Sequence, residues 1–308
     1  MANLKVLSHY PERLAPGHRL CSGCGGAIAI RQFLLGTKDP VVVGFATGCV
    51  EVATTIFPYT SWRCPYIHNA FENAAATMSG VETAYNSLKK QGKIKENIKF
   101  VTFGGDGGTY DIGLQSLSGM LERRHKVIYV CYDNEGYMNT GIQRSGATPV
   151  CAATTTAPSG KVKPGKTEQR KDLFMIAAAH RPAYAAQTTI GYWTDLISKA
   201  EKAFKYVEQG PVFINILAPC HRGWRYPQEN TVSISKLAAD TLFWPMLEYE
   251  EGKIKITYKP RQKKPMTEWL KAQRRFDHLF TPQYQNMLEQ IQKDVDDYWV
   301  YLEKLSAI

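Results

Sequence analysis

Four cysteines have the clearest capacity for chemistry in this sequence. Cys21 and Cys24 form a C-x-x-C pair, Cys49 follows in the next apolar segment, and Cys220 lies far downstream. Four thiolates can hold zinc or an iron–sulfur cluster, and the spacing does not decide between them. A compact zinc ribbon would need a second C-x-x-C, which the sequence lacks. Taken alone, the C-x-x-C pair is equally typical of a redox pair or a packed turn.

A glycine-rich acidic segment is the second candidate for chemistry. Gly104-Gly105-Asp106-Gly107-Gly108 follows one apolar run, and Asp133-Asn134 follows the next. Glycines let the backbone approach phosphate oxygens, and a carboxylate with an amide oxygen suits Mg²⁺. The pairing of G-D-G with a later N resembles the thiamine diphosphate fingerprint, whereas a dinucleotide-type G-x-G-x-x-G is absent from this segment. Alone, G-G-D-G-G would also fit a tight turn with an acidic cap.

Apolar runs of strand length alternate with helical patterns along the middle of the chain, which predicts an α/β fold with a doubly wound parallel sheet. We expect strands at 41–46, 98–103, 126–132, 184–188 and 212–217. We expect helices at 69–90, 111–124, 171–180, 193–208 and 282–305. The Thr-, Pro- and Gly-rich segment 148–165 reads as a long ordered loop or lid.

The domain organisation predicted from these patterns has two parts. Residues 1–227 should form the cofactor-binding domain with the cysteine site. Residues 228–308 should form a C-terminal helical extension that packs against another subunit and carries one short strand at 254–257.

Composition excludes several classes of protein. The 308 residues are 44% hydrophobic, enough for a large core, and neither a membrane-spanning run nor a signal-peptide core is apparent. We therefore expect a cytoplasmic protein, where cysteines more often ligate metal, react or pack than pair in disulfides. The net charge is +10, and nine Lys or Arg fall in 253–275 without a nucleic-acid-reading motif. We interpret that stretch as a solvated or subunit-facing surface, with docking of an acidic redox protein as the alternative.

Longer motifs resemble the beta subunits of pyruvate:ferredoxin oxidoreductases (pyruvate synthases), within the 2-oxoacid:ferredoxin oxidoreductase family. The resemblance spans residues 17–280 and includes the late Cys220. Its motifs are G-H-R-L-C-S-G-C-G, A-T-G-C-V-E-V, F-P-Y-T-S-W, H-N-A-F-E-N, G-G-D-G-G-T-Y-D-I-G-L-Q-S-L-S-G-M-L-E-R and Y-D-N-E-G-Y-M-N-T-G-I-Q-R-S. It implies a sheet of the thiamine-diphosphate-binding type.

The resemblance also implies roles for individual residues. The expected [4Fe–4S] ligands are Cys21, Cys24, Cys49 and Cys220. The expected Mg²⁺ ligands are Asp106, Asn134 and the backbone oxygen of Gly136. The expected cofactor-binding residues are Gly26, Cys49, Gly105, Asp106, Gly107, Gly108, Asn134, Glu135, Gly136, Tyr137, Met138 and Asn139. Asn139 is also the expected catalytic residue, near the reacting carbon of the substrate, and Gly26 stands where some members have a glutamate.

The implied activity is thiamine-diphosphate-dependent oxidative decarboxylation of a 2-oxoacid, with electrons passed to the [4Fe–4S] cluster and the acyl group to coenzyme A. Pyruvate is the favoured substrate. The sequence lacks a C-x-x-C-x-x-C-x-x-x-C-P pattern, so onward clusters belong to another polypeptide. The implied partners are alpha, gamma and delta subunits, or fused equivalents, and ferredoxin, with no nucleic acid and no membrane. The resemblance assigns the glutamate that activates the cofactor to the alpha subunit, so this chain alone should be inactive.

Three other interpretations stay open on the sequence. One is the same chemistry on another 2-oxoacid such as oxalate, without coenzyme A. Another is a non-redox thiamine-dependent decarboxylase with a structural zinc site, and the third is a zinc-stabilised, basic nucleic-acid-binding module.

Further residues are candidates for the site or for ordinary structural roles. His68, Asn69 and Asn73 lie at an expected helix start, where they would serve either the site or capping. The remaining candidates for contacts to an anionic substrate, or for structural ion pairs and loop contacts, are Arg144, Arg222, Arg225 and 154–156.

Overall fold

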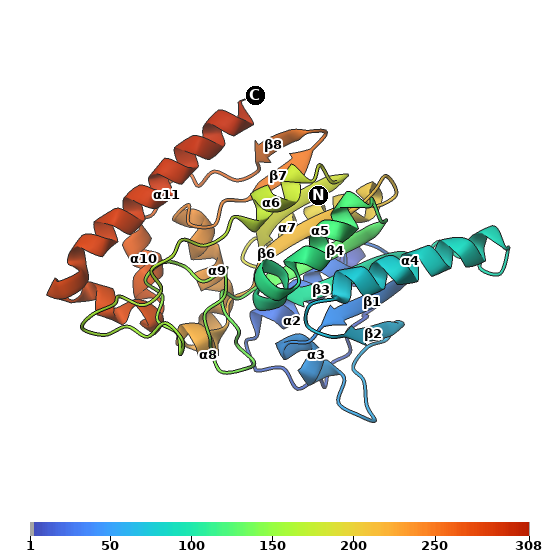
Figure 1. Ribbon diagram of the computed structural model, residues 1–308, viewed down its shortest axis with the longest axis horizontal. Helices are drawn as coiled ribbons and strands as arrows, with labels where there is room; N and C mark the ends of the chain where they lie inside the picture. Colours follow the sequence, from blue (N-terminus) through green and yellow to red (C-terminus); the bar gives the residue numbers. More distant parts are fainter. Residues whose placement is uncertain (1–2, 308) are drawn as a thin grey trace.

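Eight strands form one sheet at the centre of the molecule (Figure 1), in the order β2-β1-β3-β4-β6-β5-β7-β8. The computed structural model describes residues 3–307. The strands are β1 Val41–Ala46, β2 Tyr66–Asn69, β3 Lys99–Gly105, β4 Val127–Asp133, β5 Tyr184–Thr189, β6 Val212–Leu217, β7 Leu247–Glu250 and β8 Lys253–Ile256. The first six strands in the sheet order run parallel, and β7 and β8 continue the sheet antiparallel. The predicted α/β class and parallel sheet are confirmed, with an antiparallel edge added.

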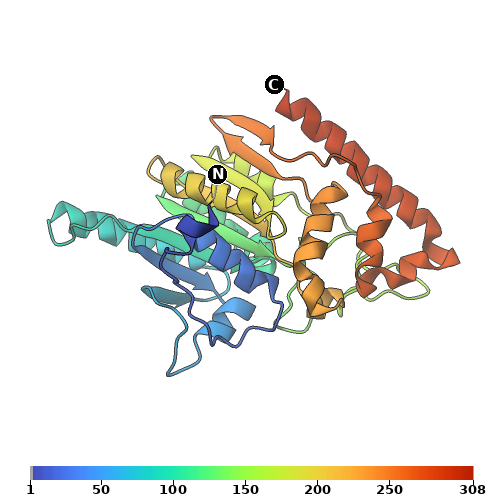
Figure 2. The ribbon, with the colours of Figure 1, turned by 180° about the vertical axis from the view of Figure 1, so that it is seen from behind.

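Helices cover both faces of the sheet. Figure 2 shows α2 (Gly25–Leu34) and α7 (Trp193–Tyr206) on one face, and Figure 1 shows α4 (Ala74–Lys90), α5 (Leu114–Glu122) and α6 (Leu173–Ala179) on the other. Each helix layer shares a separate apolar core with the side chains of alternate strand residues. Every residue of β4, β5 and β6 is buried as a result. This double cover explains why β4 and β6 are nearly continuous apolar runs instead of alternating patterns.

The chain after β6 adds helices and a third core. Its helices are α8 His221–Trp224, η2 Gln228–Asn230, α9 Thr231–Asp240, α10 Met266–Lys271, η3 Arg274–Phe280, η4 Pro282–Tyr284 and α11 Gln285–Ser306. This core is aromatic, and Trp269 and Phe243 stack in it with ring centroids 4.1 Å apart. Cys151, Ala152 and Leu217 from the earlier part of the chain belong to the same core. The helical extension therefore packs on its own chain, whatever else it contacts.

Ion pairs within the chain neutralise much of the basic stretch 253–275. Lys259 pairs with Glu303 at 2.8 Å and Lys255 with Glu250 at 2.9 Å. Lys263 pairs with Asp296. These contacts give the positive charge an intramolecular role in holding β8 and α11 in place.

Several element boundaries differ from the prediction. The helix expected at 69–90 begins at Ala74, because β2 occupies the residues before it. The helix expected at 111–124 is preceded by a six-residue π-helix, η1 Gly107–Ile112, which starts directly after Asp106. Strand β7 was not predicted, and β2 was missed because it is a short, largely half-exposed edge strand without an apolar run.

The segment 148–165 is an ordered loop, as one of the two predicted interpretations required. Its backbone is tied down where the N–H of Cys151 donates to the carbonyl of Lys166 at 2.7 Å and that of Ala153 to Arg275 at 3.1 Å. Among residues 3–307, no helix has both the length and the apolar character to cross a membrane.

We expect the substitution Trp269→Ala to reduce the free energy of unfolding by about 3–5 kcal/mol, because it removes a fully buried indole from the third core. Chemical denaturation monitored by circular dichroism measures this difference. Phe57→Ala is the control, since Phe57 is 94% exposed and its loss should change the value by less than about 0.5 kcal/mol. Equal effects of the two substitutions would contradict the assignment of Trp269 to a stabilising core.

Candidate functional site

The carboxyl ends of four neighbouring strands carry the candidate residues. Cys49, Asp106, Asn134 and Cys220 follow β1, β3, β4 and β6, respectively, by one to three residues. These strands are adjacent and parallel in the sheet order. Ligands of open α/β sheets bind at this edge, so the fold brings the two predicted sites to one place.

The cysteine pair near the N-terminus reaches this edge through a tight backbone contact. The N–H of Gly25 donates to the carbonyl of Pro219 at 3.3 Å, directly before Cys220. A Cβ on Gly25 would lie 2.6 Å from backbone atoms of Ala218 and Pro219, so only glycine allows this approach. The loop with Cys21 and Cys24 is thereby held against the end of β6.

The thiols of the four cysteines lie within electrostatic reach of one another. Burial raises the pKa of Cys49 to about 12, and repulsion from the thiolates of Cys220, Cys24 and Cys21 adds to the shift. Burial likewise raises the pKa of Cys220 to about 11, with smaller contributions from Cys24 and Cys21. Buried thiols such as those of Cys49 and Cys220 become thiolates when a cation binds them, because ligation replaces the proton. Within the described residues, no three His, Cys, Asp or Glu side chains lie close enough to ligate one metal ion.

The predicted Mg²⁺ ligands also meet at one point. Asp106 is 1% exposed, and its Oδ1 accepts a hydrogen bond from the backbone N–H of Asn134 at 3.3 Å. One terminal position of the Asn134 amide lies 3.0 Å from Asp106 Oδ1 and 2.8 Å from the carbonyl oxygen of Gly136. An amide nitrogen there donates to both oxygens, whereas an amide oxygen completes a set of three oxygen ligands. Adjacent ligands of an octahedral Mg²⁺ are about 3.0 Å apart, so this donor set fits the ion.

The electrostatics of Asp106 favour a cation at that point. Burial, and then the charge of Asp133, raise the pKa of Asp106 well above its ordinary value. The hydroxyl of Ser145 donates to Asp106 Oδ2 and partly offsets this effect. A divalent cation would stabilise the ionised carboxylate much more strongly than one hydroxyl does.

The glycines around Asp106 are required by aromatic packing as well as by any phosphate. A Cβ on Gly107 would lie 2.4 Å from the ring of Tyr137, and one on Gly104 would lie 2.4 Å from the hydroxyl of Tyr129. Tyr137 also donates through its hydroxyl to the carbonyl of Gly107 at 3.2 Å. The two segments predicted to hold the diphosphate therefore pack directly on each other.

Other predicted site residues have distinct surroundings. The side chain of Glu135 is fully buried and accepts hydrogen bonds from two arginines. Met138 packs against Gly136 and Gly223, and Asn139 is exposed. Gly26 lies beside Cys21, Cys24, Cys49 and Cys220, which we call the cysteine group. A Cβ on Gly26 would lie 3.6 Å from the sulfur of Cys24.

The remaining candidates are partly corrected. His68 and Asn69 end β2 and do not start a helix, and His68 Nε2 lies 2.8 Å from Thr47 Oγ1. Asn73 is the N-cap of α4, without a side-chain capping bond. The threonines at 154–156 tie the long loop to the loop after Met138, since the Thr155 hydroxyl donates to Gly141 and the Thr156 hydroxyl accepts from the Arg144 N–H.

Several residues at the site gave no sequence signal. Ser145 contacts Asp106, and Trp224 donates through its ring N–H to the carbonyl of Asn134 at 2.7 Å. Arg170 and Arg275 bind the carboxylates on either side of Asn134. Each of these contacts joins positions that lie far apart in sequence, so no local pattern marks them.

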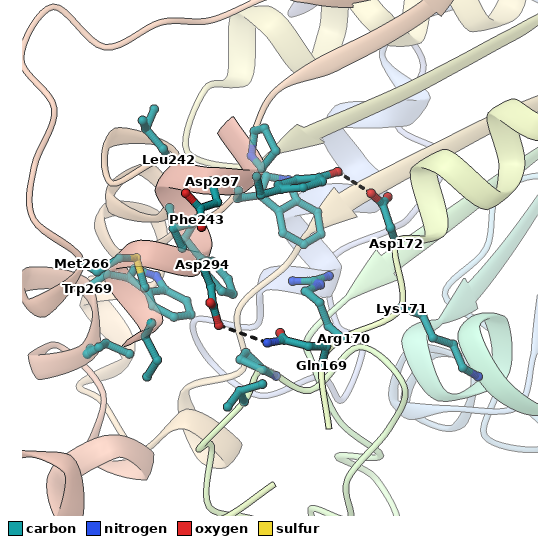
Figure 3. A pocket seen from close by; sticks show the side chains of 18 of the residues that line it. Gln169, Arg170, Lys171, Asp172, Leu242, Phe243, Met266, Trp269, Asp294 and Asp297 are labelled. Atoms are coloured by element: carbon teal, nitrogen blue, oxygen red, sulfur yellow. Dashed lines mark hydrogen bonds between the residues drawn. The ribbon is translucent and has the colours of Figure 1, made fainter. Parts of the chain in front are cut away.

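A separate cavity of about 380 Å³ lies behind the site, between the C-terminal helices and the start of α6 (Figure 3). Its walls are mostly apolar and aromatic, and Asp172 and Gln169 meet Tyr298 and Asp294, respectively, across it. None of the residues predicted for cofactor or metal binding lines it. Arg170 is the link, because its guanidinium lies against Trp244 in this cavity and also bonds to Asp133.

Comparisons with known proteins point to one family. Residues 46–216 match the family model described as thiamine pyrophosphate enzyme, C-terminal TPP binding domain. Pyruvate synthase subunit PorB of Thermotoga maritima is 53% identical, covering 99% of this chain and 97% of the relative. The PorB subunit of Methanocaldococcus jannaschii is 50% identical, covering 95% and 97%. Ketoisovalerate oxidoreductase subunit VorB of Pyrococcus abyssi is 40% identical, covering 97% and 95%.

A solved structure is similar in fold. It is the 2-oxoglutarate:ferredoxin oxidoreductase of Magnetococcus marinus, with a TM-score of 0.55 and 18% identity, covering 75% of this chain and 80% of that one. At this identity the similarity concerns the fold alone.

We expect Gly107→Ala to reduce the free energy of unfolding by about 1–3 kcal/mol, because the new methyl group overlaps the Tyr137 ring. Thermal or chemical denaturation measures the change. Gly80→Ala is the matched control: nothing lies within 4 Å of a Cβ there, and the position is inside α4. That control should stabilise the protein by about 0.5–1 kcal/mol. A neutral Gly107→Ala would show that the two segments do not pack as described.

Proposed function

This chain belongs to the pyruvate synthase PorB family of thiamine pyrophosphate enzymes, and from that membership we propose that it is the thiamine-diphosphate-binding beta subunit of a 2-oxoacid:ferredoxin oxidoreductase acting on pyruvate. One observation carries the proposal: the cysteine group and the oxygen set around Asp106 meet at the same edge of the sheet. Repulsion between Cys49 and Asp106 is itself part of the pKa shift of Cys49. An electron acceptor beside a carbanion-forming cofactor is the arrangement that oxidative decarboxylation needs.

The residues around Asp106 would hold the cofactor. Asp106, Asn134 and the carbonyl of Gly136 would ligate Mg²⁺, and the backbone of 105–108 would approach the diphosphate. When bound, thiamine diphosphate supplies the nucleophilic carbon and the electron sink for loss of CO₂ from a 2-oxoacid. Asn139 lies at the exposed end of the same loop, and we assign it a catalytic position next to the reacting carbon of the substrate.

The cysteine group supports a [4Fe–4S] cluster over a zinc ion. Thiolates on one tetrahedral zinc are about 3.8 Å apart, given a Zn–S bond of about 2.3 Å. In a cluster each thiolate binds a different iron, so the sulfurs lie further apart. The four thiols here influence one another electrostatically, yet in the described part of the chain no three of them share a single-ion site. This combination favours Cys21, Cys24, Cys49 and Cys220 as cluster ligands.

The rest of the activity belongs to an assembly. We assign the activating glutamate to an alpha subunit, the onward clusters to gamma or delta subunits or fused equivalents, and the final electron transfer to ferredoxin. Coenzyme A would take the acyl group, and the complex would reside in the cytoplasm. The VorB relative, at 40% identity, makes a branched 2-oxoacid the second candidate substrate.

We expect this chain, purified anaerobically without its partner subunits, to show a broad absorbance near 400 nm and to contain about four irons and four acid-labile sulfides, because four thiolates match one cubane cluster. Cys220→Ser should lower the iron content attributed to this chain, while Cys64→Ser, outside the group, should leave it unchanged. A colourless protein with stoichiometric zinc would overturn the cluster assignment.

Turnover separates the substrates. We expect the assembled complex to reduce ferredoxin with pyruvate and coenzyme A faster than with 2-oxoisovalerate, 2-oxoglutarate or oxalate, and the isolated chain to be inactive. Assays of reduction rates across this panel, with and without coenzyme A, measure the preference. Turnover by the isolated chain, or a stronger response to oxalate without coenzyme A, would contradict the proposal.

A further inference from the structure

Buried ion pairs hold the loop that carries the proposed metal ligand Asn134, and they lie on both sides of that residue. Asp133 and Glu135, which flank Asn134, are fully buried. Arg170 donates from Nη2 to Asp133 Oδ2 and from Nη1 to Glu135 Oε1, both at 3.0 Å. Arg275 donates to the other oxygen of Glu135 at 2.5 Å. We call Arg170 and Arg275 the arginine clamp.

The clamp is itself fixed by aromatic rings of the later part of the chain. The guanidinium of Arg170, a residue labelled in Figure 3, lies 4.7 Å from the ring centre of Trp244, and that of Arg275 lies 4.0 Å from the ring centre of Trp224. Trp224 in turn donates to the carbonyl of Asn134 at 2.7 Å. The guanidinium groups therefore have little freedom to move, and neither does the loop that they hold.

The loop needs such support. Glu135 has φ 63°, a left-handed backbone conformation that costs a non-glycine residue about 1–2 kcal/mol. The turn at Glu135 brings the carbonyl oxygen of Gly136 next to the side-chain amide of Asn134. A strained conformation persists only where surrounding contacts determine it, and the bonds to the Glu135 carboxylate are among those contacts, together with the backbone bonds of Glu135 to Asp133 and Thr148.

The charges of the clamp also select where a cation binds. Two guanidinium groups match the two carboxylates of Asp133 and Glu135, so those carboxylates have partners already. Asp106 is the buried carboxylate of this loop system for which the described residues provide no ion pair. A divalent cation is therefore directed to Asp106 and excluded from Asp133.

We propose that Arg170 and Arg275 are positioning residues for the metal site, which hold the oxygens of Asn134 and Gly136 where they meet Asp106. The proposal rests on the metal site of the proposed function and extends it to two residues distant in sequence. It also couples the C-terminal extension, which carries Arg275, to cofactor binding. Residues that orient metal ligands from behind typically change metal affinity by about 10–100-fold when replaced.

Binding of Mn²⁺, a paramagnetic substitute for Mg²⁺, tests the clamp without reference to activity. The assembled complex, stripped of divalent metal and thiamine diphosphate with EDTA, is titrated with Mn²⁺ in excess thiamine diphosphate, and electron paramagnetic resonance measures the free ion. We expect Arg170→Gln and Arg275→Gln to weaken Mn²⁺ binding about 10–100-fold relative to the unsubstituted complex. Arg170→Lys should weaken it less than Arg170→Gln, because it keeps the charge but cannot bridge two carboxylates.

Arg13→Gln is the matched control. Arg13 is a buried arginine that donates to the carbonyls of Leu34 and Thr37, distant from the site. It should lower the melting temperature but leave Mn²⁺ affinity unchanged. Glu135→Gln serves if a clamp variant fails to fold, because it releases the same loop with almost no change in volume and should also weaken Mn²⁺ binding.

The outcomes separate the clamp from the proposed function. If the unsubstituted complex does not bind Mn²⁺ in the presence of thiamine diphosphate, the proposed metal site itself is wrong. If the unsubstituted complex binds Mn²⁺ and the clamp variants bind it with affinities within threefold of that value, the positioning role of the arginine clamp is rejected and the metal site is not. If Arg13→Gln loses as much Mn²⁺ affinity as the clamp variants do, the losses reflect general destabilisation of the protein. That result would also reject the positioning role of the clamp.

Discussion

The candidate site depends on one buried carboxylate, Asp106, for which the described residues provide no ion pair. Asp106 is almost fully enclosed where β3 ends, and its hydroxyl and amide partners do not offset the cost of ionisation. A buried charge in this state is expensive unless it is paired or ligates a metal. The parallel order of the strands brings Asn134 and the four cysteines to the same edge of the sheet. The cation proposed to balance the charge of Asp106 and the proposed electron acceptor are therefore neighbours.

The chain after β6 is part of this site and not an appendage. Its aromatic core holds Arg275 and Trp224 against the loop that carries Asn134. The loop at 148–165 belongs to the same packing unit, since Ala153 bonds to the backbone of Arg275. The division at residue 227 stays a prediction, and Trp224 and Arg275 contact neighbouring residues in the loop that carries the predicted metal ligand Asn134.

Sequence reasoning reached the elements whose signal is local. The bounds of β1 and β6 match the predicted runs residue for residue, because helices cover both faces of those strands and nearly all of their residues are apolar. It missed β2, whose edge position lets polar residues occupy it. Spacing singled out Asp106 and Asn134, which are in contact in the structure, but it gave no sign of Arg275, whose bond to Glu135 joins positions 140 residues apart. For Gly107 the sequence suggested phosphate approach or a tight turn, whereas the structure shows that the Tyr137 ring leaves no room for a Cβ there.

Anomalous diffraction from crystals of the assembled complex, loaded with Mn²⁺ and thiamine diphosphate, would examine the whole edge at once. Data at the iron and manganese absorption edges would locate both metals independently. We expect an iron peak among the sulfurs of Cys21, Cys24, Cys49 and Cys220, and a manganese peak bounded by Asp106, Asn134 and Gly136. A manganese peak at Asp133, or iron absent from the four cysteines, would contradict the proposed site.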